Sequence, residues 1–310
     1  MTVNGQGKDN FKPALALRAG MLSIATVIFL ILIKLYATVE NGSVSVLASL
    51  IDSLTDAAAS LVTYLAIRVS LKPADSDHRF GHGKVEGLAA LFQAAFIGGA
   101  GVFLLLESLS RLGGGVPLDH SASAIAIMAI SIAISLGLVL VQKYTLKYAP
   151  SLAVESDSAH YSMDILINLG VIVILLALNA GAPHWIDPAF AIVVAGYLGM
   201  TVWKIAAKGV DMLLDRELPD DTRLAITQKV LAQKGVLGMH DLRTRMSGMR
   251  IFISFDMELD PALSLNDAHD IVRAVEHALF ADYPNAEILI HPDPHGDTHD
   301  TRHQVAGVHH

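Results

Sequence analysis

Two pairs of metal-binding residue types occur in the chain at the same helical spacing. Asp52 and Asp56 lie in LASLIDSLTDAAASLV, and His160 and Asp164 lie in DSAHYSMDIL. Residues four apart on a helix share a face, one turn apart. Three carboxylates and one imidazole suit a tetrahedral Zn²⁺-like site, so the pairs predict one four-ligand centre. For the first pair the alternatives are a polar seam between helices or a helix-end pair that faces water. For the second pair the alternative is a separate interfacial patch.

A third group of potential ligands lies in the segment PADSDHRFGHGKVEG. A short turn would bring Asp75, His78 and His82 around one metal ion, with Asp77 as a substitute ligand. Carboxylate and imidazole are ordinary ligands of divalent transition metals. The segment is also polar, and a solvated loop without a metal explains the same residues.

A fourth set is spread over the last third of the chain, in His240, His269, His291 and Asp293. Alternate residues of a strand share a face, so His291 and Asp293 are expected side by side. Scattered histidines are more often surface residues than ligands, and that alternative stays open. The end of the chain adds a His-rich tail, which either binds metal loosely or is unstructured. Its residues are His295, Asp297, His299, Asp300, His303, His309 and His310.

The elements that carry the first two pairs are predicted to lie in a membrane. The chain is 53% hydrophobic and 17% charged, with a mean hydropathy of +0.49, whereas globular chains average about 25% charged. Residues 121–141 and 165–183 carry no charge, and about 20 apolar residues cross a bilayer. A carboxylate at mid-membrane costs at least about 2.5 kcal/mol. Two on one helix stripe therefore call for a compensating cation.

The apolar blocks predict six transmembrane helices, which divide at turn-forming segments. We place them near residues 15–38, 43–71, 85–111, 120–143, 157–180 and 186–206. Lysine and arginine mark the cytoplasmic side of a membrane protein, and eleven of the thirteen before residue 211 fall on one side of this arrangement. Both termini are therefore predicted to be cytoplasmic.

The remaining hundred residues have a different character. Residues 1–210 hold 13 basic and 13 acidic residues, whereas residues 211–310 hold 9 and 17, which is all of the net charge of −8. Asp220, Asp221 and Thr222 are expected to cap a helix that ends near Gln233. Strands near 237–245 and 250–259, a helix opened by Ser264 and a strand at 286–292 follow. This αββαβ order predicts a small ferredoxin-like α/β domain.

The predicted organisation has five parts. These are a cytoplasmic segment (1–14), a six-helix transmembrane domain (15–206), a linker (207–218), a cytoplasmic ferredoxin-like domain (219–294) and a His-rich tail (295–310).

Several function classes are excluded by what the sequence lacks. There is no cysteine, which removes thiolate sites, disfavours Cu(I) and leaves zinc, iron, manganese or cobalt. There is no HExxH, GxSxG or phosphate-binding glycine loop, so no enzyme is expected. The sequence has no basic patch of the kind that binds nucleic acid, so no nucleic-acid partner is expected.

Taken together, these motifs resemble the cation diffusion facilitator family. The Asp-xxx-Asp and His-xxx-Asp pairs, the loop string DSDHRFGHGK, and the strings LLDREL, HDLRTR and ILIHPDP are similar to those of its bacterial zinc and ferrous-iron efflux members. The similarity covers about residues 12–294.

The resemblance implies a role for each residue set. It makes Asp52, Asp56, His160 and Asp164 the transport site, and Asp75, His78 and His82 a loop site. It also implies a homodimer in the cell inner membrane that exchanges Zn²⁺, or Fe²⁺, Mn²⁺ or Cd²⁺, for protons. In that dimer Lys84 and Asp215 would form a charge interlock. A binuclear cytoplasmic zinc site would use His240, Asp256, His269, His291 and Asp293.

Asp256 departs from the family pattern, since close relatives have histidine there. A carboxylate still binds zinc, so an altered site is expected. Metal ligands must be deprotonated, and an imidazole titrates near pH 6.5, so protons and metal compete for one site. The competing interpretation is a membrane-anchored metal sensor or store that does not transport.

Overall fold

The computed structural model describes residues 12–41, 44–112, 122–183 and 185–296. Near some helix ends the side chains lie outside the described part, and the side chain of Asp52 is one of them. The chain divides into two compact units, one spanning Lys12–Val210 and the other beginning at Asp211. The finer domain bounds predicted from the sequence stay a prediction.

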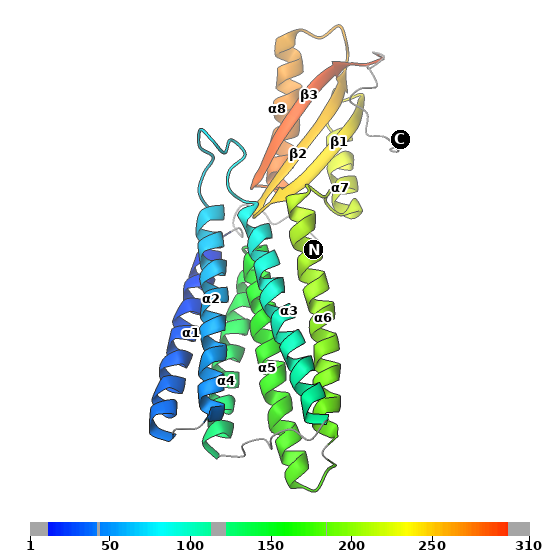
Figure 1. Cartoon of the computed structure of the whole chain (residues 1–310). Coiled ribbons are helices and arrows are strands. Elements are labelled where there is room, and N and C mark those ends of the chain that lie inside the picture. The colour runs from blue at the N-terminus through cyan, green and yellow to red at the C-terminus, as the bar shows by residue number, and fades with distance from the viewer. Residues whose placement is uncertain (1–11, 42–43, 113–121, 184, 297–310) are drawn as a thin grey trace. The chain divides into compact units, whose positions relative to one another are not determined.

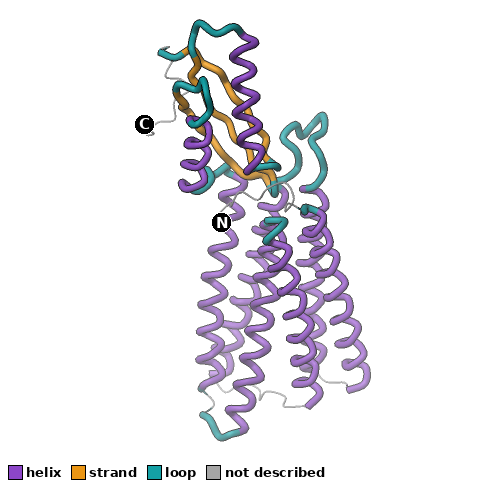
Figure 2. Tube along the Cα trace, turned by 180° about the vertical axis from the view of Figure 1, so that it is seen from behind, coloured by secondary structure: helices purple, strands orange, loops and turns teal. Residues whose placement is uncertain are grey.

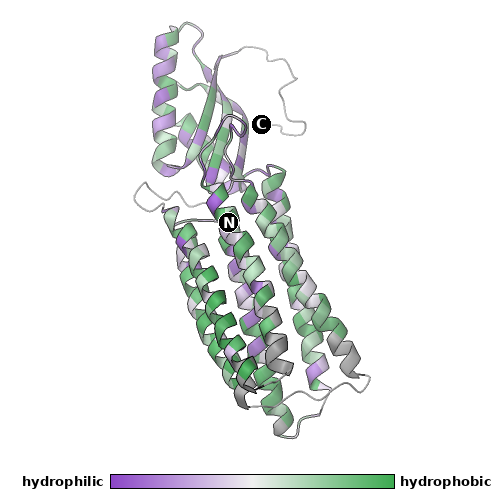
Figure 3. Ribbon diagram, turned by 60° about the vertical axis from the view of Figure 1, so that its left-hand side comes forward, coloured by the Kyte–Doolittle hydropathy of each residue, from purple (hydrophilic) through white to green (hydrophobic). Residues whose placement is uncertain are grey.

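Six long helices form the first unit (Figure 1). They are α1 (Ala14–Asn41), α2 (Val44–Ser70), α3 (Val85–Leu112), α4 (Ala122–Leu146), α5 (Leu152–Asn179) and α6 (Ile186–Leu213). Within the described residues, five of the six are long and apolar enough to cross a membrane, and the exception is α2. Figure 3 shows that most residues along these helices are hydrophobic. The predicted six-helix membrane architecture is confirmed, and α2 is the span that carries the acidic pair.

Two helix ends differ most from the prediction, for local reasons. Helix α5 begins at Leu152 rather than near 157, because the Ser151 hydroxyl caps it by accepting the N–H of Val154 at 3.3 Å. Helix α6 continues to Leu213 rather than 206. It ends only where Asp215 adopts a left-handed backbone with φ of 58°, because such a residue cannot continue an α-helix.

The packing of the first unit places α2 and α5 in direct contact. Helix α2 packs against α1, α3 and α5, while α4 packs against α1 and α5. Glu86, at the start of α3, is fully buried and accepts hydrogen bonds from Ser70 (2.9 Å) and Ser151 (2.7 Å). This carboxylate therefore joins the end of α2 to the beginnings of α3 and α5. We call this end of the bundle the loop end, because the 71–84 loop connects α2 to α3 here.

The second unit has the predicted αββαβ order. Its elements are α7 (Asp220–Leu231), β1 (Gly238–Ser247), β2 (Arg250–Leu259), α8 (Leu265–Asp282) and β3 (Ala286–Pro294). The sheet order is β1-β2-β3, with β1 antiparallel and β3 parallel to β2. Helix α8 makes the crossover that a parallel neighbour requires. Both helices lie against one side of the sheet (Figure 2).

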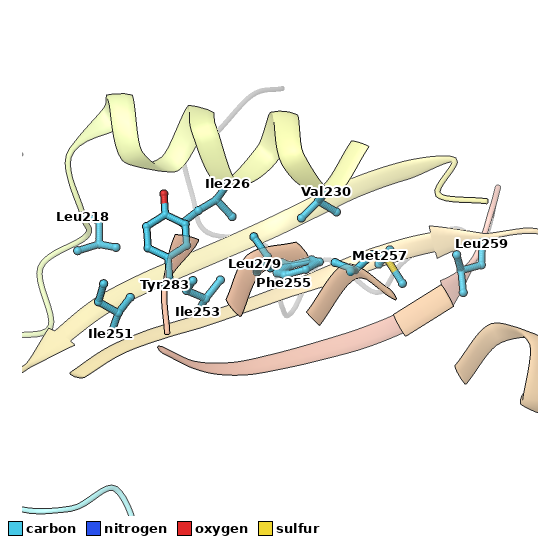
Figure 4. Packing of buried hydrophobic residues seen from close by; sticks show 11 residues of the cluster. Leu218, Ile226, Val230, Ile251, Ile253, Phe255, Met257, Leu259, Leu279 and Tyr283 are labelled. Carbon is cyan, nitrogen blue, oxygen red and sulfur yellow. The ribbon is translucent and has the colours of Figure 1, made fainter. Parts of the chain in front are cut away.

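The apolar core of this unit lies between the helices and one face of the sheet (Figure 4). Alternate residues of β2, from Ile251 through Ile253, Phe255 and Met257 to Leu259, are all buried. They pack on Ile226, Val230, Val275 and Leu279 of the helices and on Tyr283, which directly follows α8. Since the side chains of a strand alternate between faces, Asp256 and Glu258 lie on the opposite face, which these helices leave uncovered.

The predicted capping is confirmed for α8 and wrong for α7. The Ser264 hydroxyl accepts the N–H of Asp267 at 3.2 Å, as an N-cap serine does. Helix α7 has Pro219 at its N-cap and no side-chain cap hydrogen bond, so Asp220 and Asp221 lie in its first turn instead. In the first turn their negative charge interacts favourably with the positive end of the helix dipole. The β1–β2 turn uses Gly248 with φ of 58°, a conformation that glycine adopts without strain.

Candidate metal centres

The transmembrane candidate is a buried group of three side chains from α2 and α5. His160 Nε2 lies 2.9 Å from Asp56 Oδ1 and 3.5 Å from Asp164 Oδ2. One ligand atom from each of the three residues lies within 4.8 Å of the others. Asp56 and His160 are buried, whereas Asp164 is about a quarter exposed. The structure therefore brings together three of the four residues predicted from spacing.

The faces of two helices position this group. His160 and Asp164 are one turn apart on α5, and Asp56 comes from α2, which packs directly on α5. The fourth predicted ligand, Asp52, is one turn from Asp56 on α2, but its side chain lies outside the described residues. Its role as a ligand stays a prediction.

The chemistry of this group is that of a small nitrogen and oxygen site. His160 Nε2 points at two carboxylates, and its Nδ1 is buried without a hydrogen bond in the described part of the chain. The atom that hydrogen-bonds to Asp56 is thus the atom that faces both carboxylates. A proton on Nε2 and a metal ion at Nε2 exclude one another.

The second candidate is the loop group, in which both predicted histidines contact the same carboxylate. His78 Nδ1 and His82 Nε2 each lie 3.3 Å from Asp75, on its two different oxygens. The two imidazole rings are 4.6 Å apart between centroids. Gly81 forms the turn between them with φ of 79°. Asp77, the predicted substitute ligand, is not part of this group among the described residues.

The backbone of the loop stabilises the negative charge of Asp75. Its carboxylate accepts the backbone N–H groups of His78 (2.7 Å) and Asp77 (3.0 Å). These hydrogen bonds, that of His78 foremost, hold the pKa of Asp75 below its usual range. Because the pKa of Asp75 is lower in the folded loop, its ionisation stabilises the loop at pH values above the usual Asp range. That stabilisation is lost as pH falls through the lowered pKa. Asp75 is therefore ionised at neutral pH.

We expect the His82→Ala variant to bind one zinc ion fewer per chain than the wild type at neutral pH. His82 is the least exposed of the three loop side chains, at 13%, so its removal deletes the ligand that water replaces least well. Equilibrium dialysis with radioactive zinc measures the bound ions. Arg79→Ala is the matched control, because Arg79 lies in the same loop and offers no ligand atom. An unchanged zinc count in His82→Ala would make the loop an ordinary polar turn.

The third candidate is on the sheet face that the helices of the second unit leave uncovered. His240 pairs in register with Asp256, and Asp256 pairs with His291 on the next strand. Directly paired residues share a face of a sheet, so three neighbouring strands present one row of ligand types. Ligand atoms of His240, Asp256 and Asp293 lie within 4.8 Å of one another. The sequence had placed Asp256 in this set only through the family resemblance.

Two local features orient His240. The β1–β2 register shifts just after it, where Asp241 adopts a left-handed φ of 50°. Such bulges redirect side chains. Glu258 then lies 3.2 Å from His240 Nδ1. Because an ionised carboxylate only accepts, Nδ1 carries the proton and leaves Nε2 facing Asp256 and Asp293, as in a carboxylate–histidine–metal arrangement.

Glu258 itself is held by a residue that the sequence had assigned to the tail. His295 Nδ1 lies 2.6 Å from Glu258, and the His295 backbone N–H donates to Leu259 at 2.7 Å. These imidazole contacts, His295 first and His240 second, hold the pKa of Glu258 below its usual range. The resulting stabilisation is present above that range and is lost as pH falls through the lowered pKa. His295 lies in the turn that follows β3, and these two hydrogen bonds attach it to the end of β2.

Two residues predicted for the cytoplasmic site are not members of this three-residue group. His291 Nε2 lies 3.0 Å from Asp293, but its side chain is largely exposed. His269 is exposed on α8 and is absent from each cluster formed by the described residues. Asp215, expected to interlock with Lys84, accepts a hydrogen bond from Arg245 at 3.0 Å. The roles of these residues in a dimer stay predictions.

A polar junction inside the helix bundle was not predicted from the sequence. Asp157 of α5 is buried and accepts hydrogen bonds from Ser23 and Gln142, both at 2.7 Å. It lies three residues before His160, on the same helix face. That spacing is present in the sequence, but the donors on other helices are ordinary polar residues that no motif indicates.

Comparison with known proteins agrees with this arrangement. Residues 20–214 match the model of the cation efflux transmembrane domain, and residues 218–295 match that of the cation efflux protein cytoplasmic domain. The chain is 42% identical to the cation-efflux pump FieF of Shewanella oneidensis over 276 residues, which is 89% of this chain and 93% of that protein. It belongs to the cation efflux family.

A second curated relative of this cation efflux protein gives the same result. The cation-efflux pump FieF of Yersinia pestis is 41% identical over 89% of this chain and 92% of its own length. A solved structure of CzrB in its zinc form is 28% identical, covers 28% of this chain and 99% of that one, and has a TM-score of 0.25. The resemblance inferred from sequence motifs is confirmed, and the chain is a multi-pass membrane protein of a transporter family.

Proposed function

We propose that this protein exports divalent transition-metal cations from the cytoplasm, with Zn²⁺ as the foremost substrate and protons as the counter-ion. The observation that carries the proposal is the group of Asp56, His160 and Asp164 between α2 and α5, within the segment that matches the cation efflux transmembrane domain. Ionisable residues inside a membrane mark ion pathways, and this set offers nitrogen and oxygen ligands without thiolate. Fe²⁺, Mn²⁺ and Cd²⁺ are the other candidate substrates, and no enzyme activity is proposed.

The position of one atom supports proton coupling. In the described structure His160 Nε2 shares a hydrogen bond with Asp56 at 2.9 Å. When the site opens to the cytoplasm, a cation replaces that proton. When it opens to the other side, where proton activity is higher, the proton returns and the cation leaves. Inward proton movement thereby drives outward metal movement.

The proposed setting is a homodimer in the cell inner membrane, with both termini in the cytoplasm. Residues 211–310 hold the whole net charge of −8, so two such units repel one another. Divalent cations bound to each unit would offset that repulsion. The residues that would hold them are His240, Asp256, His269, His291 and Asp293, and their donor chemistry fits zinc.

The experiment that tests transport is zinc flux into sealed proteoliposomes with an imposed proton gradient. The proposal expects flux that rises with the gradient and collapses when an ionophore removes it. Zinc that binds to the protein but never accumulates inside the vesicles would instead indicate a membrane-anchored sensor or store. Repeating the assay with Fe²⁺, Mn²⁺ and Cd²⁺ ranks the substrates.

We expect two classes of zinc site of unequal affinity in the cytoplasmic unit. The group with His240, Asp256 and Asp293 contains one nitrogen ligand, so it should bind zinc more weakly than a site that uses His269 and His291. Isothermal titration should show the weaker class lost in Asp256→Ala and the stronger lost in His269→Ala. A single class in the unmodified protein would contradict the binuclear site and leave these histidines as surface residues.

A further inference from the structure

Helix α5 carries a buried carboxylate that the transport proposal does not use. Asp157 is 1% exposed and is not among the clustered ligand atoms of the transmembrane group within the described residues. Its Oδ2 accepts hydrogen bonds from Ser23 of α1 and Gln142 of α4, and its Oδ1 accepts one from Gln93 of α3 at 3.3 Å. Ser60 of α2 lies at the limit of hydrogen bonding, 3.5 Å from Oδ1. One side chain thus joins five helices.

The donors are also joined to one another. Gln142 Nε2 lies 3.1 Å from Ser23, Gln93 Nε2 donates to Thr63 at 2.8 Å, and Ser60 lies 2.8 Å from the Tyr161 hydroxyl. All these side chains are buried. We name this set the Asp157 junction, consisting of Ser23, Ser60, Thr63, Gln93, Gln142, Asp157 and Tyr161.

The Asp157 junction continues the two helix faces that carry the metal ligands. On α5, Asp157 precedes His160 by three residues and Asp164 by seven, which places all three on one face. On α2, Ser60 follows Asp56 by four residues, again on one face. Three residues of α-helix span about 4.5 Å, so the junction lies about one turn from the metal ligands, on the side of the loop end.

We propose that Asp157 is a positioning residue for the transmembrane metal centre. Its hydrogen bonds fix the rotation of α5 against α1, α3 and α4, and thereby hold His160 and Asp164 where they meet Asp56. Each helix residue turns the chain by about 100°, so a modest rotation of α5 would separate His160 Nε2 from its carboxylate partner. This inference rests on the metal centre proposed above and adds a residue that supports it without binding the cation.

The chemistry of the hydrogen-bond donors allows a substitution at 157 that separates the effect of charge from the effect of hydrogen bonding. Serine hydroxyls and glutamine amides both donate and accept hydrogen bonds. An asparagine at 157 can therefore be accommodated when Gln142 or Ser23 turns its acceptor toward the new amide, which keeps the junction and removes the charge. A leucine of similar size keeps neither, and it leaves the buried glutamine donors without their acceptor.

The test measures zinc affinity of the full-length protein by competition with a fluorescent chelator. Each variant is compared with the same variant carrying Asp164→Ala, and the difference isolates the transmembrane centre. Asp157→Leu should weaken zinc binding by at least about tenfold, as loss of supporting hydrogen bonds does at metal sites. Asp157→Asn should stay within about threefold of the wild type, and Gln142→Leu should lie between the two.

Ser156→Ala is the matched control. Ser156 is buried on the same helix, and its hydroxyl donates to Leu152 within α5 at 2.7 Å, so its loss should leave zinc affinity unchanged. A wild-type protein with no Asp164-dependent zinc binding would contradict the metal centre itself.

Two other results would overturn only the positioning role. Equal losses in Asp157→Asn and Asp157→Leu would assign the effect to charge. Lower thermal stability in Asp157→Leu with unchanged zinc affinity would make the junction purely structural.

Discussion

In the Asp56→Ala variant, zinc flux in proteoliposomes is expected to fall to the level of protein-free vesicles. Among the described carboxylates, Asp56 lies nearest to His160 Nε2, at 2.9 Å. Its removal takes away a charged ligand and leaves His160 without its hydrogen-bond partner from α2. The same loss is expected for Asp164→Ala and Asp52→Ala, because a centre with few ligands cannot replace a removed one without water.

The control for this prediction is a carboxylate outside the candidate sites. Asp187 lies in the first turn of α6, and Asp187→Ala should retain flux close to that of the wild type. Gel filtration and thermal melting establish that each variant is folded. A folded Asp56→Ala protein that moves zinc at the normal rate would remove the transmembrane group from the transport mechanism.

A His160→Asp variant is expected to lose much of its preference for Zn²⁺ over Mn²⁺. His160 is the only nitrogen ligand in the buried group that the structure describes, and an all-carboxylate site favours harder cations. The pH dependence of flux should also move downward, because aspartate titrates about two to three pH units below histidine.

The measurement is flux of each metal at several pH values, with His78→Asp as the matched control. That control makes the same exchange in the loop group, which lies outside the membrane-spanning helices. Its transport selectivity should stay like that of the wild type. If His160→Asp keeps the wild-type ranking of metals, His160 does not contact the transported ion.

Most of the fold follows from local patterns in the sequence. A charge-free block such as 121–141 is stable in a bilayer as a helix, because a helix satisfies its own backbone hydrogen bonds. In the second unit, alternation along β2 predicted the strand because Ile251, Ile253 and Phe255 all face the core. The i, i+4 spacing likewise predicted the clustering of His160 and Asp164, since a single helix fixes it.

Features that depend on contacts between distant segments could not be predicted. Gln93 and Gln142 lie on different helices and gain their role only when both meet Asp157. Glu258 and His295 likewise meet because β3 pairs with β2 in one register. The predicted cap of α7 was wrong for a local reason, because Pro219 occupies the N-cap position where Asp220 was expected.

The register of the sheet implies a mechanical role for any cation bound to its open face. His240, Asp256 and Asp293 come from three adjacent strands and form one group of ligand atoms, so a shared ion would cross-link the sheet from edge to edge. Binding to the folded state adds about 2.7 kcal/mol of stability when free cation is one hundred times its dissociation constant. Amide hydrogens of β1, β2 and β3 would then exchange more slowly as zinc rises, and the exchange rate of this sheet would report the free zinc around it.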